Sequence, residues 1–191
     1  MRTKLFAGAC GILFAVTASA QSGPTRPPAR SQAAPAPADT TSVDAILAAL
    51  YASVSHADGE EPDWARMRKI FLPVGMLIPP KRPNEDMFTV IDVDGFRERV
   101  QKGAAAAKQK GESTAFFEKE VARHLDCFGN VCQAFSTYEG RRAPSDEKPF
   151  VSGINSIQVV NDGQRWWVAS VVWDTERPNN PIPPEYRKNQ P

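Results

Sequence analysis

The side chains best placed for chemistry lie in the last β-rich stretch of the chain, residues 151–176. There, Asn161-Asp162-Gly163-Gln164 separates two runs of β-branched and aromatic residues. Asp-Gly between such runs is typical of a β-hairpin, because the tight turn needs positive φ at its central residues. Counting pairs outward from this turn puts Asn155 opposite Ser170, with Asp174 further along the same face. That face is apolar near the turn and polar at its far end, which predicts a ligand pocket.

Asp174 is the candidate catalytic residue. An aspartate at the rim of an apolar pocket has a raised pKa and can act as a general base, while Asn155 and Ser170 orient a substrate oxygen. The structural alternative is that Asp174 ends its strand on backbone N–H groups, with Asn155 and Ser170 bonded to each other. The catalytic interpretation requires Trp166 and Val168, on the same face, to point toward the helices.

The other face of this hairpin carries Trp167 and Trp173. Two outward tryptophans on one strand form an apolar patch, which favours either a homodimer through the sheet or a C-terminal tail docked on it. The tail, residues 177–191, is rich in proline and asparagine and keeps Ile182 and Tyr186, which can dock.

The preceding hairpin carries two cysteines. With residues 129–130 as its turn, Cys127 lies opposite Cys132, and the Cβ atoms of opposed residues are about 4.5–5.5 Å apart, close to what a disulfide needs. The alternative is a metal site that also uses His124 and Asp126. It is disfavoured because His124, three positions from Cys127, lies on the opposite face of a regular strand. We therefore expect a disulfide and no metal.

Tyr138 is a second candidate on this hairpin. The same counting places Arg123 opposite Ser136 and Val121 opposite Tyr138, on one face. The polar loop of residues 141–150 breaks the register, so which face points inward stays open. Facing inward, Tyr138 offers a phenolic donor to a ligand. Facing outward, it is a surface or dimer contact.

Helices in the first part of the chain must support these strands. Ser42 and Asp63 are suitable N-caps for two helices, and a third begins near residue 92. Short strands are expected at residues 75–78 and 87–91. Helices first and an antiparallel meander afterwards predict an α+β fold, in which the helices pack on one face of a curved, mostly antiparallel sheet.

This order of elements resembles the nuclear transport factor 2-like (NTF2-like) superfamily, especially its bacterial SnoaL-like branch. The segments that carry the likeness are Asp63-Trp64 ahead of Phe71-Leu72-Pro73, and residues 128–131, 135–139, 153–158 and 165–168. The resemblance covers about residues 42–176. It implies a cone-like half-barrel with a pocket, and homodimers through the sheet. It selects no activity, because the family holds isomerases, cyclases, dehydratases and binding modules.

Trp64 is a further candidate ligand contact. It can form an aromatic box with the tryptophans of the last hairpin, although at these spacings a place in the core is the plainer alternative.

The sequence predicts an exported protein with one domain. Residues 1–20 have the basic start, apolar segment and A-x-A cleavage site of a signal peptide. The apolar segment is too short to span a membrane, so we expect no membrane insertion. Residues 21–41 form a Pro- and Ala-rich linker, 42–176 the domain and 177–191 the tail.

Composition excludes several functions. The formal net charge is +1 and no basic run is present, which argues against nucleic acid as a partner. No nucleotide-binding glycine motif, nucleophile elbow or H-E-x-x-H zinc motif occurs, so no cofactor is expected. The leading hypothesis is an exported domain that binds a small apolar ligand, or dimerises through its sheet, without a defined catalytic activity. The alternative is an isomerase, dehydratase or cyclase that uses Asp174 as its base.

Overall fold

The computed structural model describes residues 37–81 and 85–189. The expected signal peptide and nearly all of the expected linker lie outside the described residues. Ahead of Ser42 the described residues form the short 3-10 helix η1 (Ala38–Thr40). Its Thr40 is buried, and Asp39 accepts two hydrogen bonds of 2.8 Å from the Arg66 guanidinium.

Three α-helices form as their caps predict. In α1 (Val43–Val54) the Ser42 side chain accepts from Ala45 N. In α2 (Trp64–Ile70) Asp63 accepts from Arg66 N, and in α3 (Val93–Gln109) Asp92 accepts from Gly95 N. Each cap satisfies a backbone N–H that the first helical turn leaves unpaired.

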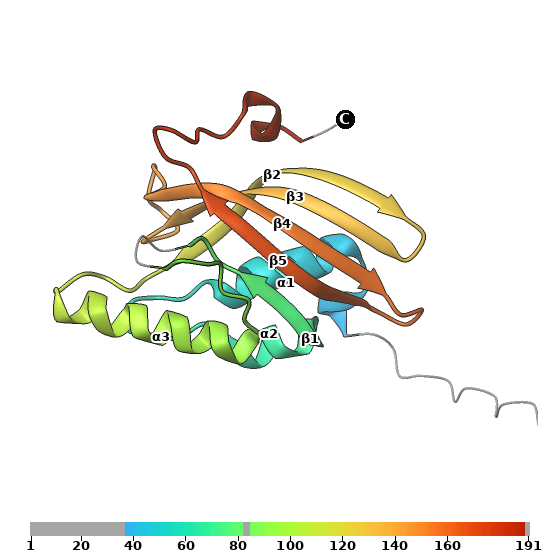
Figure 1. Ribbon diagram of the computed structural model, residues 1–191, viewed down its shortest axis with the longest axis horizontal. Coiled ribbons are helices and arrows are strands. Elements are labelled where there is room, and N and C mark those ends of the chain that lie inside the picture. Colours follow the sequence, from blue (N-terminus) through green and yellow to red (C-terminus); the bar gives the residue numbers. More distant parts are fainter. Residues whose placement is uncertain (1–36, 82–84, 190–191) are drawn as a thin grey trace, which may run out of the picture. The chain divides into compact units, whose positions relative to one another are not determined.

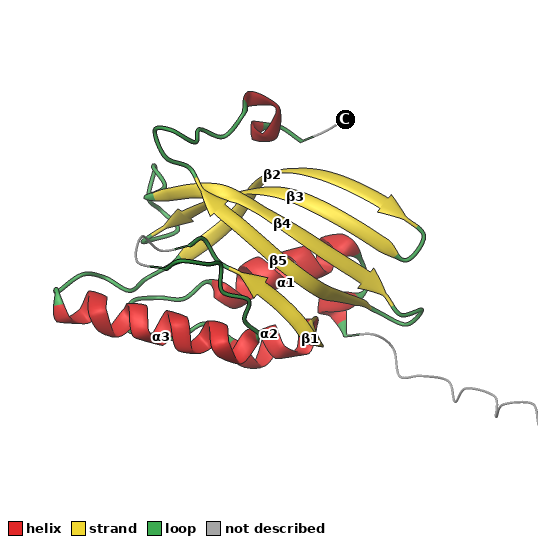
Figure 2. Ribbon diagram, in the orientation of Figure 1, coloured by secondary structure: helices red, strands yellow, loops and turns green. Residues whose placement is uncertain are grey.

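The helices pack on one face of a five-stranded sheet (Figures 1 and 2). The strands are β1 (Phe71–Ile78), β2 (Phe117–Phe128), β3 (Val131–Arg141), β4 (Val151–Asn161) and β5 (Trp166–Thr175), in the order β1-β5-β4-β3-β2. Only the β1–β5 pair is parallel. The predicted α+β class, with a mostly antiparallel sheet, is confirmed. The strand expected at residues 87–91 is wrong, because Ile91 forms only one bridge, to Leu77.

The core lies between the helices and the inner face of the sheet. Ile46 and Leu47 of α1, Met67 of α2, and Ile157 and Val168 of the sheet are completely buried there. Burial of such apolar side chains is the main favourable term in folding. The core therefore fixes the helices against β4 and β5, which are the strands that carry most of the predicted site.

The β2–β3 hairpin follows the predicted register near its turn and departs from it further away. Cys127 pairs with Cys132 and Arg123 with Ser136, as expected. A bulge at Val121 then adds one residue to β2, so that Glu120, and not Val121, lies opposite Tyr138. Because an extra residue reverses the alternation of side chains, it turns the first part of β2 over.

The last hairpin departs from the predicted register twice. Its turn spans Asp162 to Arg165, and Asn161 therefore pairs with Trp166. This shift leaves the faces unchanged, and Val168 points into the core as predicted. A bulge at Ala169, between the pairs Val159–Val168 and Gln158–Ser170, then reverses the faces.

The Ala169 bulge corrects three predictions about β5. Asn155 pairs with Trp173 and not with Ser170. Trp173, expected to face outward, lies against the core on the inner face. Asp174, expected to share that inner face, lies on the outer face and is exposed.

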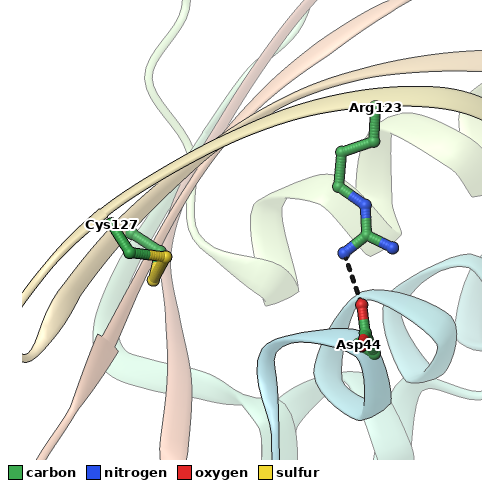
Figure 3. The surroundings of a disulfide bond; sticks show 4 residues. Asp44, Arg123 and Cys127 are labelled. Carbon is green, nitrogen blue, oxygen red and sulfur yellow. Dashed lines mark hydrogen bonds and ion pairs between the residues drawn. A yellow bond between two sulfur atoms is a disulfide. The ribbon is translucent and has the colours of Figure 1, made fainter. Parts of the chain in front are cut away.

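Two links hold β2 to its surroundings (Figure 3). A disulfide joins Cys127 to Cys132, as predicted. Arg123 reaches from β2 to the first turn of α1, where its Nη1 lies 2.8 Å from Asp44 Oδ1. Asp44 is largely exposed, so this ion pair contributes little to stability.

The C-terminal tail docks on the outer face of the sheet (Figure 1). The Tyr186 ring lies 4.7 Å from that of His124 and 4.9 Å from that of Phe135, centroid to centroid. The Thr137 hydroxyl donates to Tyr186 O, and Ile182 is buried. The docking that Ile182 and Tyr186 suggested is thus observed, on β2 and β3.

Candidate ligand pocket

A pocket of about 390 Å³ lies between the helices and the inner face of the sheet. Its walls are mostly apolar, and Leu50, Met67, Leu77 and Val171 line its buried end. Trp173 also lines it, packed edge-on against Phe96 with ring centroids 5.8 Å apart. The volume lies within the range of about 300–1,000 Å³ usual for small-molecule sites.

The pocket opens beside the C-terminal half of α3. Gly103, Ala104 and Ala107 line it there, from one face of the helix. Because their side chains are absent or small, they leave space that larger residues would fill. Arg142 and Phe150, both exposed, line the same opening, with the guanidinium 3.9 Å from the centre of the ring.

A chain of hydrogen bonds runs beside the pocket through three of its lining residues, Asn155, Tyr51 and Glu118. Ser136 donates to Glu120, so Tyr51, whose Oη lies 2.6 Å from Ser136 Oγ, is the donor in that pair. Asn155 Nδ2 donates to Tyr51 Oη and to Glu118 Oε1, both at 3.1 Å. All the donor protons of this chain are thereby directed toward the two glutamates, which fixes the orientation of the Asn155 amide.

Glu118 is the carboxylate among the residues that line the pocket. Burial raises the pKa of its carboxyl to about 7, and the hydrogen bond from Asn155 opposes the rise. Its side chain borders the pocket and so keeps some accessible surface, although the surrounding protein removes it from bulk water. Near neutral pH the group is therefore divided between its charged and neutral forms, as a general acid or base requires.

Tyr138 supplies a second polar group. Its side chain is buried and lines the pocket, and no hydrogen bond joins its Oη to another described residue. Burial raises its pKa, and the negative charges of Glu118 and Asp174 raise it further, so the phenol keeps its proton. The ring fits because Gly153 has no side chain, since a Cβ there would lie 2.6 Å from Tyr138 Oη.

The predicted site residues divide into two groups. Asn155 and Tyr138 line the pocket, while Trp64, Ser170 and Asp174 do not. Trp64 is a core residue whose Nε1 donates to Glu61 Oε2 at 3.0 Å. The ligand-binding roles expected for these predicted residues stay predictions.

The environment predicted for Asp174 is wrong. Its side chain is 51% exposed and lies 2.8 Å from Arg177 Nη1. The hydrogen bond from Arg177 is the main reason that its pKa is lowered and not raised. An exposed, paired carboxylate on the outer face lacks the pKa near neutrality that the proposed base needed.

Three pocket residues, Glu118, Tyr51 and Trp173, were not found from the sequence. Regular alternation along β2 and β5 puts Glu118 and Trp173 on the outer face, and the bulges at Val121 and Ala169 turn them inward. Tyr51 was visible as the one residue with a polar group on an otherwise aliphatic helix face, and that was the available indication.

Two features are absent from the part of the chain that the structure describes. No three histidine, cysteine or acidic side chains there lie close enough together to hold a metal ion. None of the helices described has the length and apolar character needed to cross a membrane.

Comparison with known proteins finds similarity at the level of structure. No family model matches the sequence, and no curated protein does. Similar solved structures include an NTF2-like protein of unknown function from Silicibacter pomeroyi, which is 13% identical with a TM-score of 0.43. The match covers 70% of this chain and 92% of that one.

Two further solved structures are similar. An NTF2-like protein of unknown function from Shewanella baltica is 14% identical (TM-score 0.45; 69% of this chain, 91% of that one). A protein described as a candidate ketosteroid isomerase from Parabacteroides distasonis is 8% identical (TM-score 0.47; 75% and 99%). At such identities the matches say nothing of activity.

Proposed function

We propose that the domain binds a small amphipathic molecule, with its apolar body along the pocket walls and one polar group beside Glu118, Tyr138 and Asn155. The observation that carries this is the distribution of polarity. The walls are apolar, whereas Glu118, Tyr138 and Asn155 converge at one end. A few convergent polar groups in an apolar cavity orient a ligand, which is the usual design of a small-molecule site.

Blocking the opening tests this proposal. Ala104→Trp puts a large ring into the opening, and Ala105→Trp puts the same ring on the exposed side of α3. N-phenyl-1-naphthylamine, a small apolar fluorophore, should bind the native protein and Ala105→Trp alike. Its affinity for Ala104→Trp should be at least about tenfold lower. That factor corresponds to a loss of about 1.4 kcal/mol in binding free energy.

Native mass spectrometry of the purified protein adds an independent readout, a retained small molecule that is lost in Ala104→Trp. Equal binding by the two tryptophan variants, or no binding by the native protein, would exclude the pocket as a binding site.

Acid–base catalysis is the second candidate, and Glu118 takes the place first given to Asp174. A carboxyl with a pKa of about 7 beside a neutral phenol favours an isomerase, dehydratase or cyclase. Glu118 would remove a proton from carbon, and Tyr138 and Asn155 would donate hydrogen bonds to the oxygen that gains charge. Exchange of the α-hydrogens of cyclohexanone for deuterium, followed by NMR, measures this chemistry without knowledge of the substrate. Exchange that is no faster than in Glu118→Gln would rule it out.

Export and membership of the SnoaL-like branch are part of the same proposal. The disulfide supports export, because such bonds persist in oxidising compartments. The mass of the exported protein should place its first residue at Gln21. A homodimer through the sheet is the further proposal, and the docked tail leaves β4 and β5 as its available outer surface. Sedimentation equilibrium measures the assembly state.

A further inference from the structure

We propose that the ligand carries an ammonium group, which the pocket holds between Glu118 and the faces of its aromatic rings. This rests on the proposed function, since it specifies what the polar end of a bound molecule must be. The alkylammonium class is chosen by charge and by the kind of side chain around the pocket.

The first reason is that Glu118 lacks a cation. Its side-chain partner is the neutral Asn155, at 3.1 Å, and the described arginines, lysines and histidines form no ion pair with it. A buried carboxylate is costly unless a positive charge pairs with it. The protein supplies hydrogen bonds to Glu118 and leaves that charge to be supplied from outside.

The second reason is that the neighbouring groups are already engaged or neutral. Tyr51 of α1 and Tyr138 of β3 are phenols that keep their protons. Glu120 accepts from Ser136 and pairs with Arg123, whose Nη2 lies 3.1 Å away. None of these groups can neutralise Glu118.

The two cationic or titratable side chains at the edge of the pocket are also engaged. Arg142 stacks on Phe150 and donates to Ala115 O at 2.8 Å. The His56 ring, through Nδ1, donates to Ala57 O at 3.0 Å. Asp174, on the outer face, pairs with Arg177.

The third reason is the number of aromatic rings. Six aromatic side chains line this one pocket: Tyr51, Phe96, Phe116, Tyr138, Phe150 and Trp173. Ring faces attract cations, most strongly where water is excluded, and aromatic cages are a common means of binding alkylated ammonium groups. An apolar body then contacts the aliphatic walls, such as Val171 and Met67. A carboxylate ligand would instead bring a second negative charge close to Glu118.

Three probes of equal length test this. They are n-octylammonium, 1-octanol and octanoate, measured by calorimetry at about pH 8, one unit above the Glu118 pKa of about 7. The native protein should bind octylammonium about tenfold or more tighter than octanol, and octanoate most weakly. The ratio reflects a hydrogen bond from the ammonium to a charged carboxylate, which is stronger than one from a neutral hydroxyl.

Two variants identify the group responsible. Glu118→Gln keeps the shape and should lose the preference for ammonium while it still binds octanol. Asp174→Asn removes a carboxylate that does not line the pocket, and it should keep the preference. Circular dichroism and the melting temperature establish that both variants are folded.

The outcomes separate the two proposals. If none of the probes binds the native protein, the pocket itself is refuted. If octanol or octanoate binds as tightly as octylammonium, or if Glu118→Gln keeps the preference, the ammonium inference fails and the pocket stands.

Discussion

Aromatic side chains pack against each other on the outer side of the sheet and line a cavity on its inner side. On the outer face the chain brings its own aromatic cover, because Tyr186 of the tail packs on His124 and Phe135. Between the inner face and the helices, six aromatic side chains from strands, helices and loops line a cavity of about 390 Å³. Large apolar side chains are exposed elsewhere in the described chain. The cavity is therefore not explained by a lack of apolar residues.

The comparison suggests what each face is for. On the outer face the tail covers β2 and β3, whereas small residues such as Gly103 and Ala104 leave space at the opening of the pocket. An open cavity costs dispersion contacts, about 24 cal/mol for each Å³ of empty apolar space. We therefore expect the cavity to be occupied by a ligand when the protein functions.

The largest expected effect is on the inner face. Gly153→Ala would place a Cβ 2.2 Å from Asp174 O and 2.6 Å from Tyr138 Oη. The backbone of β5 cannot move away without breaking its pairing with β4, so we expect unfolding to become easier by about 3 kcal/mol. Chemical denaturation measures this.

Gly103→Ala is the matched control. A Cβ at Gly103 meets nothing within 4 Å, and the position lies inside α3, where alanine is the better helix former. It should stabilise the protein by roughly 0.5–1 kcal/mol. Equal changes in the free energy of unfolding for Gly153→Ala and Gly103→Ala would contradict the close fit of Tyr138 over Gly153.

The disulfide should affect stability without affecting the pocket. Replacing Cys127 and Cys132 together by serine removes a link that closes a short loop, which lowers the free energy of unfolding by about 2 kcal/mol. Neither cysteine lines the pocket, so binding of N-phenyl-1-naphthylamine should be unchanged. A weaker affinity in the folded variant would connect the hairpin end to the site and contradict this separation.

The outer face should respond to loss of its cover. Tyr186→Ala removes a ring that contacts His124 and Phe135, and we expect a loss of about 1.5 kcal/mol from burial and ring contacts. Lys188→Ala, an exposed change in the same tail, is the control. Hydrogen exchange should show faster exchange in β2 and β3 and no change around the pocket. Equal destabilisation by both variants would mean that the tail is held in some other way.

The same contrast shows what could be predicted from the sequence. Turn chemistry predicted the pairs close to the turn of the β2–β3 hairpin, namely Cys127 with Cys132 and Arg123 with Ser136. The inward direction of Val168 was also predicted correctly. The pairing near that turn is shifted by two positions, and an even shift leaves each side chain on its expected face.

Single-residue bulges are what the sequence did not reveal. Val121 and Ala169 are ordinary strand residues, and no local preference distinguishes them from their neighbours. Yet each one reverses every side chain beyond it. The reversal moved Asp174 out of the pocket and moved Trp173 in, and the bulge at Val121 places Glu118 opposite Gly140 on the inner face. The sequence predicted Asp174 at the pocket, whereas the carboxylate that lines it is Glu118.

The smallest effect distinguishes the two carboxyls by sign. The pKa of Glu118 rises on folding, from 4.5 to about 7, so the folded protein holds this proton more tightly than the unfolded chain does. Stability from this group is complete at low pH and is lost as pH rises from about 4.5 through about 7. Glu118→Gln should therefore be more stable than the native protein at about pH 8, by on the order of 1 kcal/mol, since the pocket partly screens the charge. It should show no such gain below the ordinary glutamate range.

Asp174 should behave in the opposite way. Its pKa is lowered on folding, chiefly by Arg177, so its contribution is present at neutral pH and is lost as pH falls through the lowered value. Asp174→Asn should thus be slightly less stable than the native protein near neutrality and equal to it in acid. Thermal melting of both variants from acid to about pH 8 compares the two slopes directly. Slopes of the same sign would mean that Glu118 is paired with a cation in solution, and they would remove the charge argument on which the ammonium ligand depends.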